Sequence, residues 1–126
     1  MLRMNLQTGP IYHLALSGEW LEVTESGEDY RRSTVGRSLE DEGFIHTSFL
    51  DQVEDTARAY YRNREVVLLE IDPEQVPSPI LVEEIGDGRM FPHIYGPIPL
   101  GAVRSAVPVP KRSDGTLDLS EVLPHS

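Results

Sequence analysis

The chain contains no cysteine, a single lysine and no long apolar run. Without cysteine, a disulfide, a thiolate metal site and a thiol nucleophile are all excluded. The one lysine, Lys111, lies near the C-terminus, which argues against Schiff-base chemistry. No segment approaches the roughly 18 apolar residues of a membrane span, and the first residues lack the apolar centre of a signal peptide. We therefore expect a cytoplasmic protein without a membrane contact, stabilised by its hydrophobic core.

Positive charge is also scarce, because 21 acidic residues face 11 basic ones and the formal net charge is −10. This charge argues against DNA, long RNA or an anionic membrane as the partner. Arg58 has Glu54 one helical turn before it, so we expect a solvent-exposed ion pair there. The sequence does not indicate the oligomeric state. A local site for a small anion stays compatible with the sequence, because six arginines fall close together in the chain: Arg31, Arg32, Arg37, Arg58, Arg62 and Arg64.

A chain of 126 residues is long enough for one compact domain. We expect residues 1–110 to form that domain and residues 111–126 to be a polar, mobile tail. Several strands and few helices predict an α+β fold with antiparallel sheets rather than a repeating βαβ layout. Strands are predicted at residues 11–16, 44–48, 66–72, 80–85, 89–95 and 102–109.

Two helices are predicted between the early strands. Ser17 is expected to cap a short helix that Gly27 ends. Ser48 is expected to cap the main helix, whose apolar residues recur at helical spacing and which ends near Asn63. The continuous apolar run at residues 66–72 then predicts a central strand that is covered on both faces.

The segment around residues 86–99 predicts a hairpin followed by a stiff rim. Asp87 and Gly88 favour a tight turn with positive φ. Prolines at positions 92, 97 and 99 place the second arm at a sheet edge or in a loop, and Gly96 permits close approach of another segment.

Three of the four histidines, His13, His46 and His93, fall inside predicted strands. Each has apolar or aromatic neighbours, which favour a neutral imidazole. A single histidine of this kind is more often a core residue bonded to a backbone carbonyl than a functional group. Three of them in different strands nevertheless indicate a shared cleft. His125 falls in the polar tail and is expected to be solvated.

Two other features near these histidines allow more than one interpretation. Of Glu83 and Glu84, only one can share the strand face of His93, and the simpler interpretation is that both are edge-strand charges that discourage aggregation. Three neutral imidazoles would also suit catalytic zinc, but their spacing lacks the close pairs typical of metal sites. We therefore rank a nucleotide site above a three-histidine zinc site and assign no metal ligand.

The sequence contains the segments IYHLA at 11–15, EGFIHTS at 42–48 and FPHIYGPIP at 91–99, with Trp20, Tyr30 and Ser38 between the first two. This set resembles a bacterial family known as domain of unknown function 952. The resemblance covers roughly residues 11–108, nearly the whole predicted domain. The family is grouped by fold with the ADP-ribosyltransferases, so the resemblance implies a split pair of small antiparallel sheets around a cleft that holds NAD.

The resemblance also implies roles for individual residues. In the toxin-like and polymerase-like ADP-ribosyltransferases, a His, a Tyr and a Glu on separate strands surround NAD. By resemblance, His13, His46 and His93 take these three catalytic positions. The candidate cofactor-binding residues carry anion-binding, hydroxyl or aromatic side chains: Arg37, Ser48, Tyr95 and Trp20.

A histidine at the third position changes the expected chemistry. Cleavage of the bond between nicotinamide and ribose builds positive charge on the sugar, which a carboxylate stabilises and an imidazole does not. The RNA 2′-phosphotransferases of this fold rely on Arg and His residues, and a histidine-bearing strand of theirs resembles FIHTS at 44–48. By this resemblance, Arg31, Arg32 or Arg37 would bind a phosphate. We expect a nucleotide-sized ligand such as NAD or ADP-ribose, bound by a transferase or by a non-catalytic module that senses nucleotides or contacts a protein.

Overall fold

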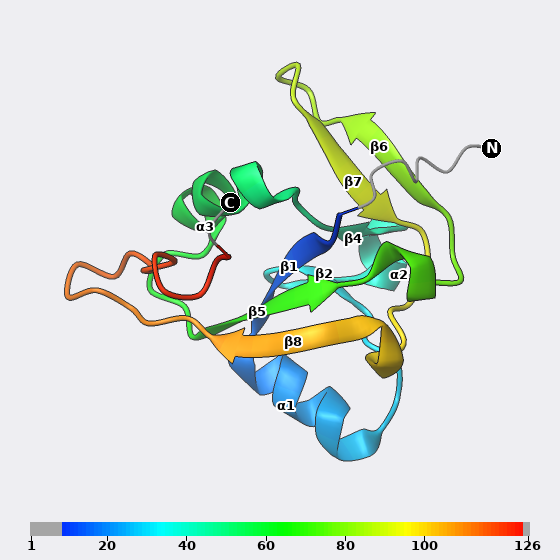
Figure 1. The fold of residues 1–126 in the computed structure, drawn as a ribbon, viewed down its shortest axis with the longest axis horizontal. Coiled ribbons are helices and arrows are strands. Elements are labelled where there is room, and N and C mark those ends of the chain that lie inside the picture. Colours follow the sequence, from blue (N-terminus) through cyan, green and yellow to red (C-terminus); the bar gives the residue numbers. More distant parts are fainter. Residues whose placement is uncertain (1–8, 125–126) are drawn as a thin grey trace.

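The fold is built on a three-stranded antiparallel sheet with the order β1-β5-β8 (Figure 1). The computed structural model describes residues 9–124 of the chain, so His125 lies outside the described residues. β5 occupies the centre of this sheet and is buried along most of its length, which confirms the prediction of a central strand. The strands are β1 (Ile11–Leu16), β5 (Val66–Ile71) and β8 (Val103–Pro108).

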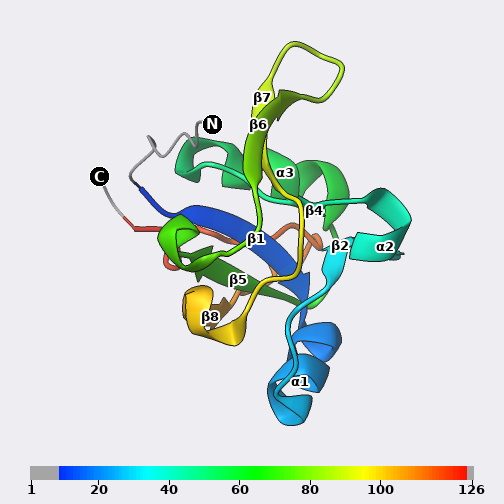
Figure 2. The same cartoon turned by 90° about the vertical axis from the view of Figure 1, so that its right-hand side faces the viewer.

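A second antiparallel sheet, with the order β4-β7-β6, contains the predicted hairpin. β6 and β7 project from the body of the molecule in both ribbon views (Figures 1 and 2). The turn is wider than a two-residue turn, because Ile85 N donates to Arg89 O around Gly86 and Gly88. Gly88 has the predicted positive φ, at 91°, but Asp87 does not, and Gly86 supplies the other positive φ of the turn, at 105°. The strands are β4 (Ile45–His46), β6 (Ile80–Glu84) and β7 (Met90–Ile94).

Helices and a short ladder complete the fold. Antiparallel sheets with few helices confirm the α+β class. Within residues 9–124, no helix has the length and apolarity needed to cross a bilayer. The ladder pairs β2 (Arg32–Thr34) with β3 (Arg37–Ser38). The α-helices are α1 (Ser17–Ser26), α2 (Leu39–Glu42) and α3 (Val53–Tyr60), and the 3₁₀ turns are η2 (Leu50–Gln52), η3 (Pro73–Gln75) and η4 (Leu100–Ala102).

The early helix ends as predicted but begins differently. Gly27 has a left-handed conformation with φ of 77° and its N–H donates to Val23 O. Ser17 is the first helical residue rather than the cap, and the preceding Leu16 makes no side-chain capping bond.

The predicted main helix from Ser48 to Asn63 is shorter than expected. Residues 50–52 form a separate 3₁₀ turn, so α3 begins only at Val53. α3 then ends at Tyr60, before Asn63, whose φ of 66° is incompatible with a right-handed helix.

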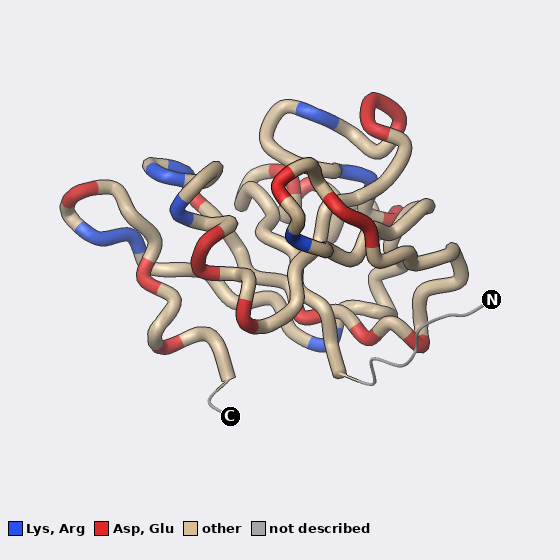
Figure 3. The backbone as a smooth tube through the Cα atoms, turned by 90° about the horizontal axis from the view of Figure 1, so that it is seen from above, with Lys and Arg blue, Asp and Glu red and all other residues tan. Residues whose placement is uncertain are grey.

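Charged side chains pair locally over the surface. Arg58 bonds to Asp55 at 2.9 Å, so the predicted pair with Glu54 was wrong by one residue. Arg31 and Arg32, the phosphate candidates of the connection before β4, lie 2.8 Å and 3.6 Å from carboxylate oxygens. Basic positions are scattered among more numerous acidic ones (Figure 3).

Pro92 departs from its predicted place, because it lies in β7, the middle strand of its sheet. β4 ends at His46, so no residue of this strand depends on the N–H group that Pro92 lacks. The Pro92 carbonyl accepts hydrogen bonds from N and Oγ1 of Thr47. The close approach predicted at Gly96 is confirmed, since a Cβ there would overlap the hydroxyl of Ser78.

The two larger sheets meet where β1 runs past the end of β4. Tyr12 and Ser48 exchange two backbone hydrogen bonds of 2.8 Å. The ring of His13, next along β1, donates to the carbonyl oxygen of His46 at 2.6 Å. This junction fixes the histidine-bearing strands relative to each other.

Alternation along β1 divides the core into two clusters. Ile11 and Ala15 belong to a cluster that includes residues of β4 and β7, whereas Tyr12 and Leu14 belong to one that includes residues of α3. The C-terminal segment from residue 111 to 124 contributes to the second cluster, where Leu119 is 1% exposed. The predicted domain boundary after residue 110 therefore cuts through a packed cluster.

We expect Leu119→Ala to lower the free energy of unfolding by about 2–5 kcal/mol, because it removes a fully buried side chain and leaves a cavity. Leu21→Ala is the matched control, since Leu21 is 56% exposed. Urea denaturation measures both variants. Equal stability of the two would show that the C-terminal segment adds nothing to the core.

Candidate functional site

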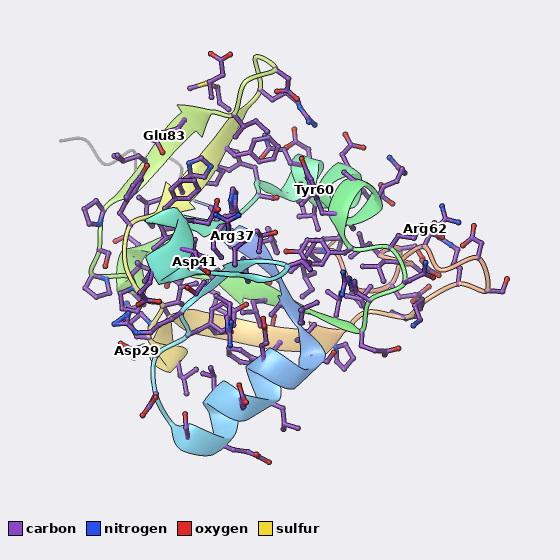
Figure 4. The ribbon with its side chains drawn as sticks, turned by 180° about the vertical axis from the view of Figure 1, so that it is seen from behind. Asp29, Arg37, Asp41, Tyr60, Arg62 and Glu83 are labelled. Carbon is purple, nitrogen blue, oxygen red and sulfur yellow. The ribbon has the colours of Figure 1, made fainter. Side chains whose placement is uncertain are left out.

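A cleft of about 400 Å³ opens between β1, β4, α3 and the free end of the β6–β7 hairpin. This volume lies within the roughly 300–1,000 Å³ of small-molecule sites. Tyr60 on α3 is 62% exposed, so its ring is accessible to a ligand (Figure 4). The aromatic residues that line the cleft are Tyr12, Tyr60, Tyr61 and Phe91.

Polar groups of opposite charge lie among these rings. Asp55 on α3 and Arg89 on the hairpin are the charged residues of the lining. The Arg89 guanidinium lies 5.4 Å from the centre of the Phe91 ring and bonds to Asp87 at 2.8 Å. Ser48 lines the cleft at the end of β4. The cleft thus offers flat apolar surface with a few hydrogen-bonding groups, as ligand sites usually do.

His13 forms part of the cleft wall but is bonded entirely inside the protein. Its Nδ1 donates to the carbonyl oxygen of His46, and the Tyr30 hydroxyl donates to its Nε2 at 2.7 Å. Burial lowers the pKa of His13 to about 4, so the ring is neutral near neutral pH. Both ring nitrogens are occupied, so His13 holds the strand junction and has no nitrogen left for a ligand.

His46 lies on the cleft and is held by the short helix α2. Ser38 and Asp41 form a reciprocal capping box that begins this helix, with bonds of 2.9 and 3.2 Å. Glu42, at its last position, accepts a bond from His46 Nε2 at 3.1 Å and pairs with Arg37 at 3.0 Å through its other oxygen. The His46 side chain remains 39% exposed, so it can contact a ligand.

His93 lies beside His46 but is buried. Its Nδ1 lies 2.8 Å from Oε1 of Glu83, and the Tyr95 hydroxyl donates to the same oxygen at 2.5 Å. Phe44 stacks on the imidazole, with ring centres 4.1 Å apart and planes at 18°. The rings of His46 and His93, which are paired residues of β4 and β7, lie 5.5 Å apart.

The ionisation of this group follows from its surroundings. Burial lowers the pKa of His93, although Glu83 acts in the opposite direction. The hydrogen bond from Tyr95 lowers the pKa of Glu83, while burial and the adjacent carboxylate raise the pKa of Tyr95 to about 12. Near neutral pH the group therefore consists of an ionised carboxylate, a neutral imidazole and a protonated phenol.

Comparison with known proteins identifies the family. A model described as "Protein of unknown function (DUF952)" matches residues 16–106, more than half of the chain. The chain belongs to this family. A search of curated proteins gave no match.

Solved structures of another protein confirm the fold. The chain is similar to the crystal structure of CC0527 from Caulobacter crescentus, with 28% identity and a TM-score of 0.79 over 90% of this chain and 97% of that one. The solution NMR structure of CC0527 gives 27% identity and a TM-score of 0.69 over 89% and 94% of the two chains. The resemblance to family 952 is thus confirmed, while the grouping with ADP-ribosyltransferases stays a prediction.

The DUF952 fold brings only some of the predicted site residues together. Ser48 lines the cleft with His46. Trp20 instead packs on Tyr30, 5.8 Å between ring centres, and is not part of the cleft lining. Arg37 and Tyr95 also lie outside the lining, where they bond to Glu42 and Glu83. Their predicted roles in NAD binding stay predictions.

Sequence reasoning missed several residues of the site, among them Glu42, Phe44, Tyr60 and Arg89. Glu42 had a readable signal, because it precedes His46 by four residues. Phe44 and Tyr60 had none, since apolar residues at these positions are typical of core packing. The structure shows which of the two adjacent glutamates contacts His93. Glu83 bonds to His93, whereas Glu84 accepts a hydrogen bond from Gly88 N. The interpretation as an edge-strand charge therefore does not suffice for Glu83.

A three-histidine zinc site is not formed, because both nitrogens of His13 are bonded within the protein. In the part of the chain that the structure describes, no three metal-ligating side chains lie close enough to hold an ion.

The buried His13 generates a prediction about stability and pH. Its pKa is about 4 in the folded protein and about 6.5 when unfolded, so the unfolded chain binds more protons between these values. Above about pH 6.5 the ring is neutral in both states, and His13 does not lower the free energy of unfolding. As the pH falls toward 4, protonation of the unfolded chain lowers the free energy of unfolding by roughly 3 kcal/mol at most.

His13→Asn keeps a donor and an acceptor but cannot titrate, so its free energy of unfolding should vary less with pH, from a lower starting value. His46→Asn is the control, since that ring is half exposed. Urea denaturation between about pH 4 and 7 measures the difference. A slope for His13→Asn equal to that of the wild type would contradict the buried neutral ring.

Proposed function

We propose that the cleft binds a nucleotide-sized ligand such as NAD or ADP-ribose. The observation that carries this proposal is the cleft itself: about 400 Å³ lined by four aromatic residues, of which Tyr60 is exposed, with the accessible His46 beside them. Aromatic side chains stack on nucleobases whatever their sequence, and such stacking contributes about 1–3 kcal/mol for each base.

The charges of the molecule support a small ligand rather than a polynucleotide. Arg89 at the cleft offers a guanidinium for a phosphate group, although Asp87 already pairs with its Nε and Nη2. The net charge of −10 and the scattered basic residues would oppose a long nucleic acid (Figure 3). A mononucleotide or dinucleotide needs only the local contact.

A transferase is the second candidate, favoured by the position of Glu83. In ADP-ribosyl transfer the nicotinamide leaves with the bonding electron pair, and the ribose carries positive charge until the acceptor adds. Glu83 bonds to His93, whose ring lies beside that of the cleft residue His46, so an ionised carboxylate lies two imidazoles away from the cleft. A 2′-phosphate transferase or a non-catalytic nucleotide sensor would use the same cleft.

We expect NAD and ADP-ribose to shift the NMR signals of cleft residues, and Tyr60→Ala to weaken binding by roughly 5- to 100-fold through the lost stacking surface. Val107→Ala is the control, because Val107 is an exposed apolar residue on β8, outside the cleft lining. Titration of isotope-labelled protein measures both.

Nicotinamide release from NAD separates the candidates. Release that needs the protein supports the transferase, and binding without release supports the sensor. The absence of any saturable shift at millimolar ligand would contradict nucleotide binding altogether.

A further inference from the structure

One ring nitrogen of His46 is open to a ligand. The side chain of His46 lines the cleft and is 39% exposed, and its Nε2 is held by Glu42 at 3.1 Å. Across residues 9–124, Nδ1 makes no hydrogen bond and is not a buried unpaired atom, so solvent reaches it. Nδ1 is therefore the nitrogen that a ligand in the cleft can contact.

The carboxylate of Glu42 fixes which nitrogen of His46 carries the proton. A carboxylate can only accept, so the neutral ring is protonated on Nε2 and has a lone pair on Nδ1. Arg37 bonds to the other oxygen of Glu42 at 3.0 Å and holds the carboxylate in place. An ionised phosphate also offers only acceptor atoms, so the ligand group that fits Nδ1 is an O–H or an N–H.

Two hydroxyl groups line the same cleft. Ser48 follows His46 by two residues, and its Oγ lies 3.3 Å from Oγ1 of Thr56 on α3. One hydrogen bond between two hydroxyls uses one of their two protons, so the second proton can go to a ligand. The cleft thus offers an acceptor at His46 and a donor at the hydroxyl pair of Ser48 and Thr56. A sugar hydroxyl is both donor and acceptor and matches this combination.

We propose that His46, oriented by Glu42, and the hydroxyl pair of Ser48 and Thr56 form a sugar subsite that selects a ribose through one of its hydroxyl groups. Nδ1 of His46 accepts a hydrogen bond from that hydroxyl. This inference rests on the proposed nucleotide binding and adds the part of the nucleotide that the cleft recognises. The exposed ring of Tyr60, on the α3 side of the cleft, remains available for the base.

A surface ion pair alone explains less of this arrangement. Ion pairs between exposed groups contribute little to stability. Glu42 is only 22% exposed and lies between Arg37 and His46, so its direction is fixed from both sides. The four residues of α2 begin at a capping box and end at Gly43, whose φ is 86°. This short helix therefore holds a carboxylate against a ring whose other nitrogen is free.

The test compares NAD with analogues that each lack one ribose hydroxyl group. We expect at least one analogue to bind about tenfold more weakly than NAD in calorimetric titration. His46→Phe should abolish this difference, while it keeps an aromatic ring and the backbone carbonyl to which His13 donates. Glu42→Gln should reduce the difference, because an amide can also donate and no longer fixes the tautomer.

Nitrogen NMR of the imidazole observes the same bond directly. In the wild type, Nε2 of His46 should have the shift of a protonated nitrogen and Nδ1 that of an unprotonated one. The Nδ1 signal should move when NAD saturates the protein, and should move less when the weak analogue does. An Nδ1 signal that responds equally to both ligands would contradict the hydrogen bond from the hydroxyl.

Glu40→Gln is the matched control, because it removes the same charge from α2 but from a side chain that pairs with Arg31 instead of His46. Its discrimination between NAD and the analogues should equal that of the wild type. An equal loss in both glutamate variants would overturn the positioning role of Glu42. If every analogue binds as tightly as NAD, the sugar subsite is overturned while nucleotide binding stands. If no dinucleotide binds, both proposals fail.

Discussion

The hydrogen bond from the buried His13 ring to the His46 carbonyl is the contact on which the site depends. Together with the backbone bonds between Tyr12 and Ser48, it ties one sheet to the other. Tyr30 donates to the second nitrogen of His13, so the joint contains no unpaired polar atom and no buried charge. The cleft is lined by the residues on either side of this joint, which explains why a polar ring lies inside a strand.

Three histidines in three strands perform three different tasks because their environments differ. His13 has both nitrogens bonded within the core, and His46 is open to the cleft with a carboxylate behind it. His93 is buried with one nitrogen on Glu83 and the other unpaired. Proximity to carboxylates and exposure to solvent, not residue type, set the chemistry available to each ring.

The sequence predicted what periodicity and turn chemistry determine. The central position of β5, the end of α1 at Gly27 and the hairpin all followed from local patterns. The start of α3 did not, because a 3₁₀ turn is compatible with the same apolar residues. The partner of His93 could not be predicted either, since strand register decides which of two adjacent glutamates shares its face, and register is a tertiary property. Packing of Leu119 was hidden by its polar neighbours.

The position of the Glu83 carboxylate bears on the proposed transferase chemistry. If the predicted grouping with the ADP-ribosyltransferases holds, His93 takes the position of their catalytic carboxylate, and Glu83 is hydrogen-bonded behind it. A charge acting through a hydrogen-bonded ring stabilises a developing cation less than a carboxylate in contact would, because the distance is larger. Under the proposed function, α3 and β1 supply binding surface, and bond cleavage would depend on how closely the β6–β7 hairpin brings the Glu83 carboxylate to the sugar of the ligand.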